Sequence, residues 1–145
     1  MTFIEKEIIL EKLLILKGYC EELETISAHL SEEEYKKNTL HKRAIERTIQ
    51  LIVEVATDIN NMILKALKKG PTADYFSSFI ELGEAEILPI EFALKIAPST
   101  GLRNVIVHEY QKIDDHIVYS SIQDVLTYYE KYVRYIFRYL GMDSE

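Results

Sequence analysis

Cysteine, glycine and proline are scarce in this sequence of 145 residues. It contains one cysteine, Cys20, five glycines and three prolines. A single cysteine excludes an internal disulfide and a cysteine-based zinc site. Few turn-forming residues, beside abundant Leu, Ile, Glu and Lys, argue against a β-sandwich or a β-barrel and favour long helices.

Long apolar runs and a positive charge balance are also missing. No uncharged apolar run approaches the roughly 18 residues that span a membrane. Glu5, Lys6 and Glu7 interrupt the N-terminal apolar residues, so we expect no signal peptide. The formal net charge of −7 excludes a basic coat for nucleic acid but leaves room for a local basic cleft. We expect one cytoplasmic domain over residues 1–145, with no membrane or DNA partner.

The spacing of apolar residues predicts an all-α protein, a four- to five-helix up-down bundle. We expect a first helix over about 3–30 and a second over about 31–69, opened by a capping box at Ser31. Alternatively, the second helix restarts at Asn38 or Thr39 after a short break. Gly70 followed by Pro71 ends it.

The second half of the chain predicts shorter helices and one long one. A helix over about 72–82 should end at Gly83, and Pro89 can begin another that kinks or restarts near Ser99. Residues 102–108 continue as helix, and a last helix covers about 118–140. It carries an aromatic stripe, which we interpret as core or a subunit interface rather than a surface that stacks RNA bases; its members are Tyr128, Tyr129, Tyr132, Tyr135, Phe137 and Tyr139.

The segment of the chain that carries chemistry runs from Arg103 to Tyr110. Its skeleton is Arg103, four residues, His108, one residue, Tyr110. By chance, a chain of this composition would hold roughly 0.01 such matches. Arginine offers a planar fork of donors to a phosphate, and histidine exchanges protons near neutral pH. Tyrosine offers a hydroxyl that orients a substrate or accepts a modification. Asn104 could hydrogen-bond a phosphate or cap the helix.

The spacing constrains how these side chains meet. Arg103 and Tyr110 would share a face of an ideal helix, whereas His108 would point about 140° from Arg103. Either the helix ends or distorts near His108, or a pocket forms between two subunits. Spacing alone favours a plainer interpretation, in which His108 caps a helix end and Tyr110 is buried.

The segment resembles the R-x-x-x-x-H-x-Y motif of the HepT family in the all-α HEPN superfamily. Residues 43–50 and 58–60 resemble the second helix of that family, and residues 110–114 and 118–119 resemble the loop and helix that follow the motif. The resemblance implies a toxin of a toxin–antitoxin pair, a homodimer that cleaves RNA without a metal and needs no cofactor. Its two motifs would face one cleft.

The resemblance also implies roles for single residues and a partner. Arg103 and His108 would be the catalytic pair of a ribonuclease. Tyr110 would accept AMP groups from an MntA-like minimal nucleotidyltransferase, the antitoxin. The chemistry is coherent: His108 can serve as general base or acid for attack by a 2′-hydroxyl, and Arg103 can neutralise the transition state. AMP on Tyr110 would add bulk and negative charge beside Arg103.

The second predicted helix adds candidate residues around the cleft. Acidic candidates are Glu46, Glu54 and Asp58. A basic patch at its start comprises His41, Lys42, Arg43 and Arg47. The polar stripe of Arg43, Arg47, Glu54, Asp58 and Asn61 is also compatible with an ordinary solvated face.

The sequence also bears on a metal site and on functions other than RNA cleavage. The spacing of Glu109, Asp114, Asp115 and His116 matches no established metal motif, so we expect no metal site. One alternative is a non-catalytic all-α interaction subunit of a nucleotidyltransferase complex, which the net charge of −7 favours. Another is a dimeric helical bundle in which the motif serves packing.

Overall fold

The computed structural model describes residues 1–109 and 112–141. Within these residues it is all-helical, as predicted, but it has seven helices rather than four or five. The helices are α1 (Phe3–Ser27), α2 (Glu32–Lys37), α3 (Thr39–Ala66), α4 (Tyr75–Glu84), α5 (Ile90–Ile96), α6 (Ser99–His108) and α7 (Asp115–Tyr139). No helix in the described part of the chain is long and apolar enough to cross a membrane.

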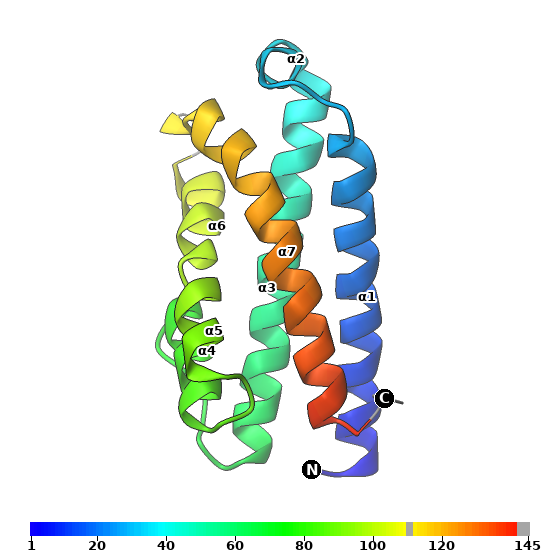
Figure 1. The fold of residues 1–145 in the computed structure, drawn as a ribbon. Coiled ribbons are helices and arrows are strands. Elements are labelled where there is room, and N and C mark those ends of the chain that lie inside the picture. The colour runs from blue at the N-terminus through cyan, green and yellow to red at the C-terminus, as the bar shows by residue number, and fades with distance from the viewer. Residues whose placement is uncertain (110–111, 142–145) are drawn as a thin grey trace.

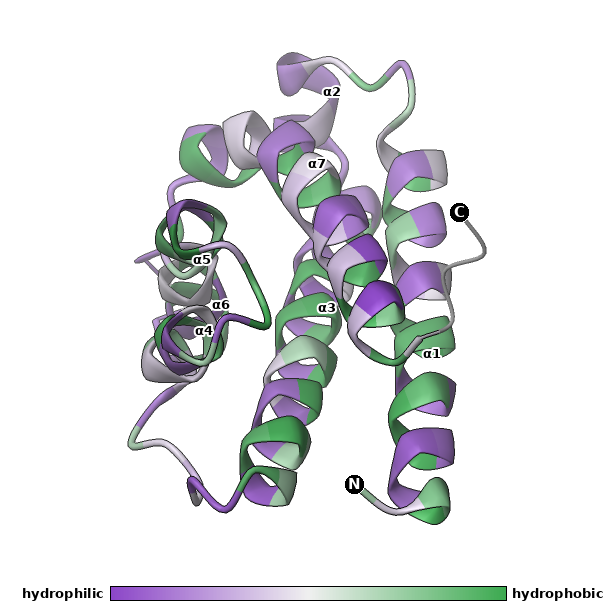
Figure 2. Cartoon of the chain, turned by 60° about the horizontal axis from the view of Figure 1, so that its bottom comes forward, coloured by the Kyte–Doolittle hydropathy of each residue, from purple (hydrophilic) through white to green (hydrophobic). Residues whose placement is uncertain are grey.

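Three long helices and one column of short helices form the bundle (Figure 1). Helix α3 packs against α1 on one side and against α4 and α6 on the other, and α7 crosses in front of it. Helices α4, α5 and α6 together take the place of a fourth long helix. Apolar and polar segments alternate along the long helices (Figure 2), and a single core of apolar side chains lies between them. The helices therefore form an up-down bundle, as predicted, although there are more of them than predicted.

Short side chains at helix starts explain most of the element boundaries. Thr2 and Ser31 each form a capping box, with Glu5 and Glu34 respectively. The Asn38 side chain accepts a hydrogen bond from the His41 N–H, so α3 begins anew after α2. The alternative break at Asn38 is thus confirmed, and the continuous helix over 31–69 is wrong.

Gly83 does not end a helix, contrary to the prediction. It lies inside α4, where a Cβ atom would meet Ala93 Cβ at 2.8 Å and Ile90 Cδ1 at 2.9 Å. Because glycine has no Cβ atom, α4 and α5 can approach each other closely at this position. The predicted restart near Ser99 is confirmed, because α6 begins at Ser99 directly after Pro98.

The aromatic stripe of α7 contributes to the core, as predicted, through its two most buried members. Tyr129 and Tyr132 are fully buried. The Tyr132 hydroxyl donates to Asn60 Oδ1 at 2.5 Å, and Asn60 Nδ2 donates to Ser78 Oγ at 3.0 Å. The Tyr129 hydroxyl lies 2.7 Å from Ser99 Oγ. These hydrogen bonds connect α7 to α3, α4 and the first residue of α6, the helix that carries the motif.

Candidate active site

Helix α6 carries the motif and ends within it. The Glu109 N–H still donates to the Val105 carbonyl at 2.9 Å, but Glu109 itself has left the helical conformation, with φ −132° and ψ 35°. His108 is therefore the last helical residue, so the predicted helix end near His108 is confirmed. Tyr110, the predicted AMP acceptor, lies outside the described residues.

Arg103 is held by groups from three elements. Its Nε and Nη2 atoms donate to the same carboxylate oxygen, Glu54 Oε2 of α3, at 3.1 and 2.7 Å. Its Nη1 donates to Asn104 Oδ1 at 3.2 Å. Its Cζ lies 4.6 Å from the centre of the Tyr75 ring at the start of α4, within cation–π distance. The guanidinium is thus fixed before any substrate arrives.

The burial of this ion pair makes it more than a surface contact. The Arg103 side chain is 14% exposed and the Glu54 side chain 26% exposed. Gln50 Nε2 also donates to Glu54 Oε2, at 3.1 Å, and so helps to orient the carboxylate. The carboxylate occupies the kind of position that a phosphate oxygen takes on an arginine fork.

Sequence reasoning missed the contact of Arg103 with Tyr75. Tyr75 follows the N-cap Asp74 of α4, and the loop between α3 and α4 sets its place beside α6. No spacing in the sequence links it to residue 103, so the contact follows from tertiary packing alone.

His108 occupies a different environment from Arg103. Its side chain is exposed at the carboxyl end of α6, and no hydrogen bond or ion pair joins it to another residue of the described chain. Because α6 stays regular through residue 108, the two side chains leave the helix about 140° apart. A single copy therefore does not aim both groups at one point, which leaves the predicted pocket between two subunits as the geometry to test.

Within the described residues, no hydrogen bond or ion pair joins Arg103 to the remaining residues predicted from the second helix. The Asp58 carboxylate lies 3.9 Å from Lys12 Nζ of α1. Glu46 is 5% exposed; its Oε1 accepts from Arg43 Nη1 at 2.8 Å, and its Oε2 has no hydrogen-bond partner in the described structure. Burial, followed by the Glu46 charge, raises the pKa of the neighbouring Tyr35 hydroxyl. Of the three acidic candidates, Glu54 alone joins the motif.

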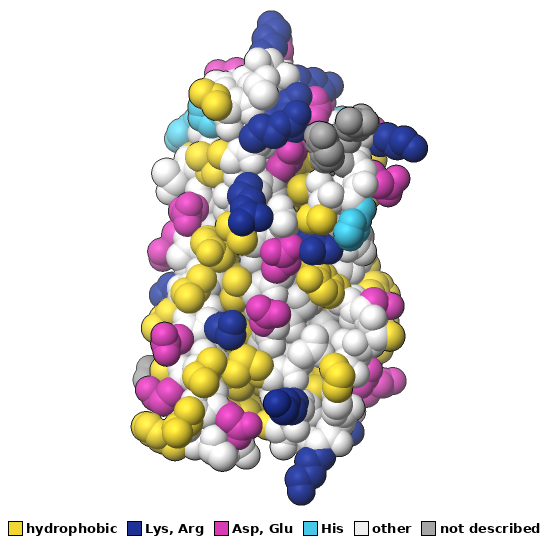
Figure 3. Space-filling model, turned by 180° about the vertical axis from the view of Figure 1, so that it is seen from behind, with side chains coloured by type: hydrophobic (Ala, Val, Ile, Leu, Met, Phe, Trp, Pro, Cys, Tyr) yellow, Lys and Arg dark blue, Asp and Glu magenta, His cyan; other side chains and the backbone are white. Residues whose placement is uncertain are grey.

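The basic candidates lie toward the His108 end of α6. Helices α3 and α6 run in opposite directions (Figure 1), and Glu54 pairs with Arg103. Measured from Glu54 along the axis of α3, Arg47 and Arg43 are therefore about 10 and 16 Å away, in the direction in which α6 runs toward His108. Both are exposed. In the rear view, charged side chains of both signs and a histidine gather over α3 and the upper end of α6 (Figure 3).

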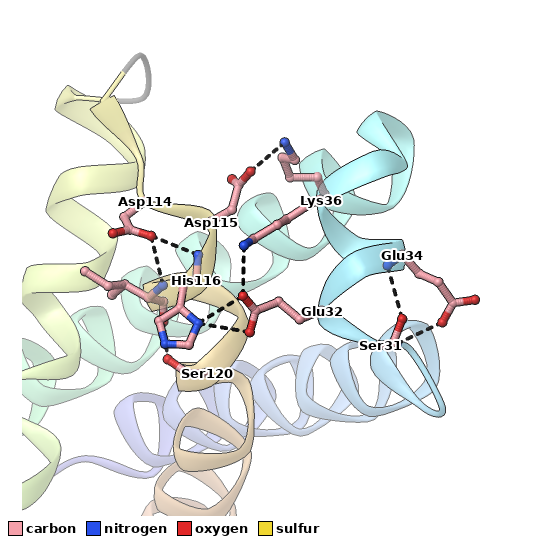
Figure 4. Close-up of polar contacts among 10 residues, drawn as sticks. Ser31, Glu32, Glu34, Lys36, Asp114, Asp115, His116 and Ser120 are labelled. Atoms are coloured by element: carbon pink, nitrogen blue, oxygen red, sulfur yellow. Dashed lines mark hydrogen bonds and ion pairs between the residues drawn. The ribbon is translucent and has the colours of Figure 1, made fainter.

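The segment after the motif is tied to α2 and α3 by polar contacts (Figure 4). The Asp114 side chain accepts from the His116 N–H at 2.9 Å and so caps α7. Lys42 Nζ of α3 lies 2.9 Å from Asp115 Oδ2. His116 Nδ1 lies 2.9 Å from Glu32 Oε1 of α2.

These contacts bear on charge and on metal binding. Hydrogen bonds from Lys36 and His116 lower the pKa of the Glu32 carboxyl. Asp114, Asp115 and His116 each serve a different partner. No group of three or more His, Cys, Asp or Glu side chains that could hold a metal ion occurs within residues 1–109 and 112–141.

Comparisons with known proteins agree in pointing to one family. The family model described as "Ribonuclease HepT-like" matches residues 16–136. The "tRNA nuclease HepT" of Aphanizomenon flos-aquae is 42% identical over 140 residues, which cover 97% of this chain and 95% of that protein. The "mRNA nuclease HepT" of Shewanella oneidensis is 23% identical over 127 residues, covering 88% and 94%.

A solved structure shares the fold. It is the tri-AMPylated Shewanella oneidensis HEPN toxin in complex with an MNT antitoxin, with a TM-score of 0.81 and 23% identity. The match covers 94% of this chain and 98% of that one. At this identity the likeness establishes the arrangement of helices rather than the chemistry.

Proposed function

The chain belongs to the HepT-like family of ribonucleases, and on that premise we propose that it is the toxin of a toxin–antitoxin pair. Its activity is metal-independent endonucleolytic cleavage of RNA in the cytoplasm. The observation that carries the proposal is that the Arg103 guanidinium is already held in one orientation without RNA. Its contacts are with Glu54, Asn104 and Tyr75.

The proposed mechanism assigns one role to each motif residue. Arg103 binds a phosphate of the RNA and stabilises the charge that develops as the 2′-hydroxyl attacks the phosphorus. His108, exposed at the helix end, takes or returns the proton. Neither role requires a metal ion. Glu54 positions the guanidinium, and Asn104 is a second group that can meet the phosphate.

A homodimer completes the proposed site. Within one copy, Arg103 and His108 diverge by about 140° along a regular helix, so a facing copy would supply the second wall of a cleft. Several large apolar side chains remain exposed along α1 and at the start of α3, and apolar side chains run along this side of the molecule (Figure 3); they include Ile4, Ile8, Ile15 and Leu40. Such a patch is typical of a protein interface.

The proposed regulation acts on Tyr110. An MntA-like nucleotidyltransferase transfers AMP to its hydroxyl, and the added phosphate competes for Arg103 and repels RNA. The solved relative of this fold is itself tri-AMPylated and bound to an MNT antitoxin, which supports the assignment. Coexpression with the partner should therefore add AMP masses to the chain, and Tyr110→Phe should remove them.

The proposed function is tested by RNA cleavage in excess chelator. Unmodified protein, made without its partner, is incubated with tRNA and mRNA beside the His108→Ala variant. His108 is exposed and makes no side-chain hydrogen bond in the described structure, so the variant should fold normally. We expect cleavage by the wild-type chain and none by the variant.

Other outcomes would replace the proposal. Absence of cleavage by both proteins would favour the non-catalytic interaction subunit, and equal cleavage by both would place the activity elsewhere. A loss of stability of about 2 kcal/mol or more in His108→Ala would instead indicate that the motif serves packing.

A further inference from the structure

A groove between α5 and α7 concentrates positive charge in an acidic protein. The cavity in this groove measures about 330 Å³.

Four cations line the α5–α7 groove, and no carboxylate lines it. They are Lys95 of α5 and Lys131, Arg134 and Arg138 of α7. Lys95, Lys131 and Arg134 are exposed, and no salt bridge within the described residues joins any of these three to an acidic side chain. The groove is therefore a local positive site on a chain of net charge −7.

Aromatic side chains form the rest of the lining. Phe92 is nearly buried, and its ring centre lies 4.9 Å from that of Tyr135 and 6.3 Å from that of Tyr128. Both tyrosines are half-buried, so packing holds the rings while part of each stays accessible. Rings of this kind offer a stacking platform to unpaired bases.

The cations of α7 follow the helix axis. Residues 131, 134 and 138 span about 10 Å along α7, which is roughly the rise of three stacked nucleotides of one strand. An acidic protein would also be attracted by the charge. Spaced cations combined with accessible aromatic rings are the features by which proteins bind single-stranded nucleic acid.

We propose that the α5–α7 groove binds the backbone of single-stranded RNA and anchors the substrate away from the Arg103 motif. The proposal rests on the proposed ribonuclease function. Lys95 belongs to α5, which directly precedes α6 in the chain. An RNA strand bound in the groove would therefore lie against the same column of short helices that carries Arg103 and His108.

The test compares two double variants in the His108→Ala background, which keeps the RNA intact. Lys95→Gln/Lys131→Gln removes two groove charges, and Lys65→Gln/Lys69→Gln removes two exposed lysines near the end of α3. Both lower the net charge by the same amount. The probe is a fluorescent oligouridine of about 20 nucleotides, titrated by anisotropy between about 50 and 200 mM KCl.

We expect the groove variant to bind the oligouridine about tenfold more weakly than the control variant. The slope of log K against log salt should become shallower by about 1.4, because each lost phosphate contact on a single strand accounts for about 0.7. Unlabelled oligouridine should displace the probe, and polyglutamate should not.

Three results would overturn the proposal. Equal affinities and slopes for the two double variants would remove the groove from RNA binding, and cleavage by the wild-type chain would then leave the proposed function standing. Displacement by polyglutamate as effective as by oligouridine would indicate a site for an acidic protein. Failure of the His108→Ala chain to bind oligouridine, together with no cleavage by the wild-type chain, would reject both proposals.

Discussion

At the scale of single residues, the ion pair between Arg103 and Glu54 is the feature that the motif alone does not reveal. Both side chains are mostly buried, and the carboxylate also accepts from Gln50. An arginine in such a setting depends on its partner, because removal of one member leaves the other charge poorly solvated. Glu54 is therefore a positioning residue for Arg103.

Glu54→Ala should lower both stability and activity. We expect the free energy of unfolding to fall by about 1 kcal/mol, since the pair is partly screened by solvent. We also expect slower RNA cleavage, because the guanidinium loses its fixed orientation. Urea denaturation and cleavage rates measure the two effects.

Asp58→Ala is the matched control for that change. Asp58 is another acidic residue of α3, but its side chain is 63% exposed and its carboxylate lies 3.9 Å from Lys12 Nζ, a long distance for an ion pair. Its removal should change stability by less than about 0.5 kcal/mol. Equal effects of the two variants would contradict the positioning role of Glu54.

The Cys20 thiol provides a prediction about pH. Burial, with smaller effects of the Glu130 and Glu21 charges, raises the pKa of this thiol from 9.0 to about 12. The folded pKa exceeds the unfolded one, so the resulting stability is present below about pH 9 and is lost as the pH rises toward 12. Iodoacetamide at about pH 8 should leave the native chain unmodified and alkylate the unfolded chain, as measured by intact mass. Rapid alkylation of native protein would contradict this.

The structure shows which of the residues predicted for the site contact one another. Arg103, Asn104 and Glu54 were all candidates, and the structure brings the three together. Asp58 was a candidate as a member of the same polar stripe as Glu54, yet a rotation of about 40° around α3 directs it to Lys12 of α1. Tyr75 was missed because its contact depends on the path of a loop.

At the scale of helices, the short segments α4 to α6 are packed around one glycine. A methyl group at Gly83 would lie 2.8 Å from Ala93 Cβ and 2.9 Å from Ile90 Cδ1. Gly83→Ala should therefore separate α4 from α5 and lower stability by about 1–3 kcal/mol. Thermal or urea unfolding measures this loss.

Gly18 offers the opposite expectation for the same substitution. It lies inside α1, and nothing is within 4 Å of the position that its Cβ would take. Gly18→Ala should leave stability unchanged or raise it by up to about 1 kcal/mol. Destabilisation of the same size at both positions would show that the stability loss in Gly83→Ala does not come from packing against α5.

Helix boundaries divide into those set locally and those set by packing. The break at Asn38 and the restart at Ser99 follow from a capping side chain and from a proline, so the sequence predicts them. The prediction that Gly83 ends a helix was wrong because the requirement for glycine comes from α5, which comes close to this position only when the chain is folded. A local rule does not see that demand.

At the scale of the whole molecule, the apolar surface of α1 gives the proposed homodimer a testable interface. We expect a solution mass of twice the 16.9 kDa of one chain by light scattering. Ile4→Ser/Ile15→Ser should shift the protein toward the monomer, because it removes apolar contact area from that surface. The two side chains are 69% and 48% exposed in the single chain, so their loss should not unfold it.

A second pair of exposed apolar residues serves as the control. Leu94 and Ile117 are 57% and 53% exposed but lie on α5 and α7. Leu94→Ser/Ile117→Ser should remain dimeric. Dissociation of this variant alone would move the interface to the α5–α7 side, and a monomeric wild-type chain would reject the homodimer.

The carboxylate on Arg103 has a consequence for selectivity. Glu54 acts as a tethered competitor, and tethering gives it an effective concentration on the order of millimolar or higher. A free phosphate ion must displace it from dilute solution and gains few contacts in return. A nucleic acid strand already held elsewhere on the protein presents its next phosphate at a comparable effective concentration. The ion pair would thus make Arg103 select for chain length before it selects for sequence.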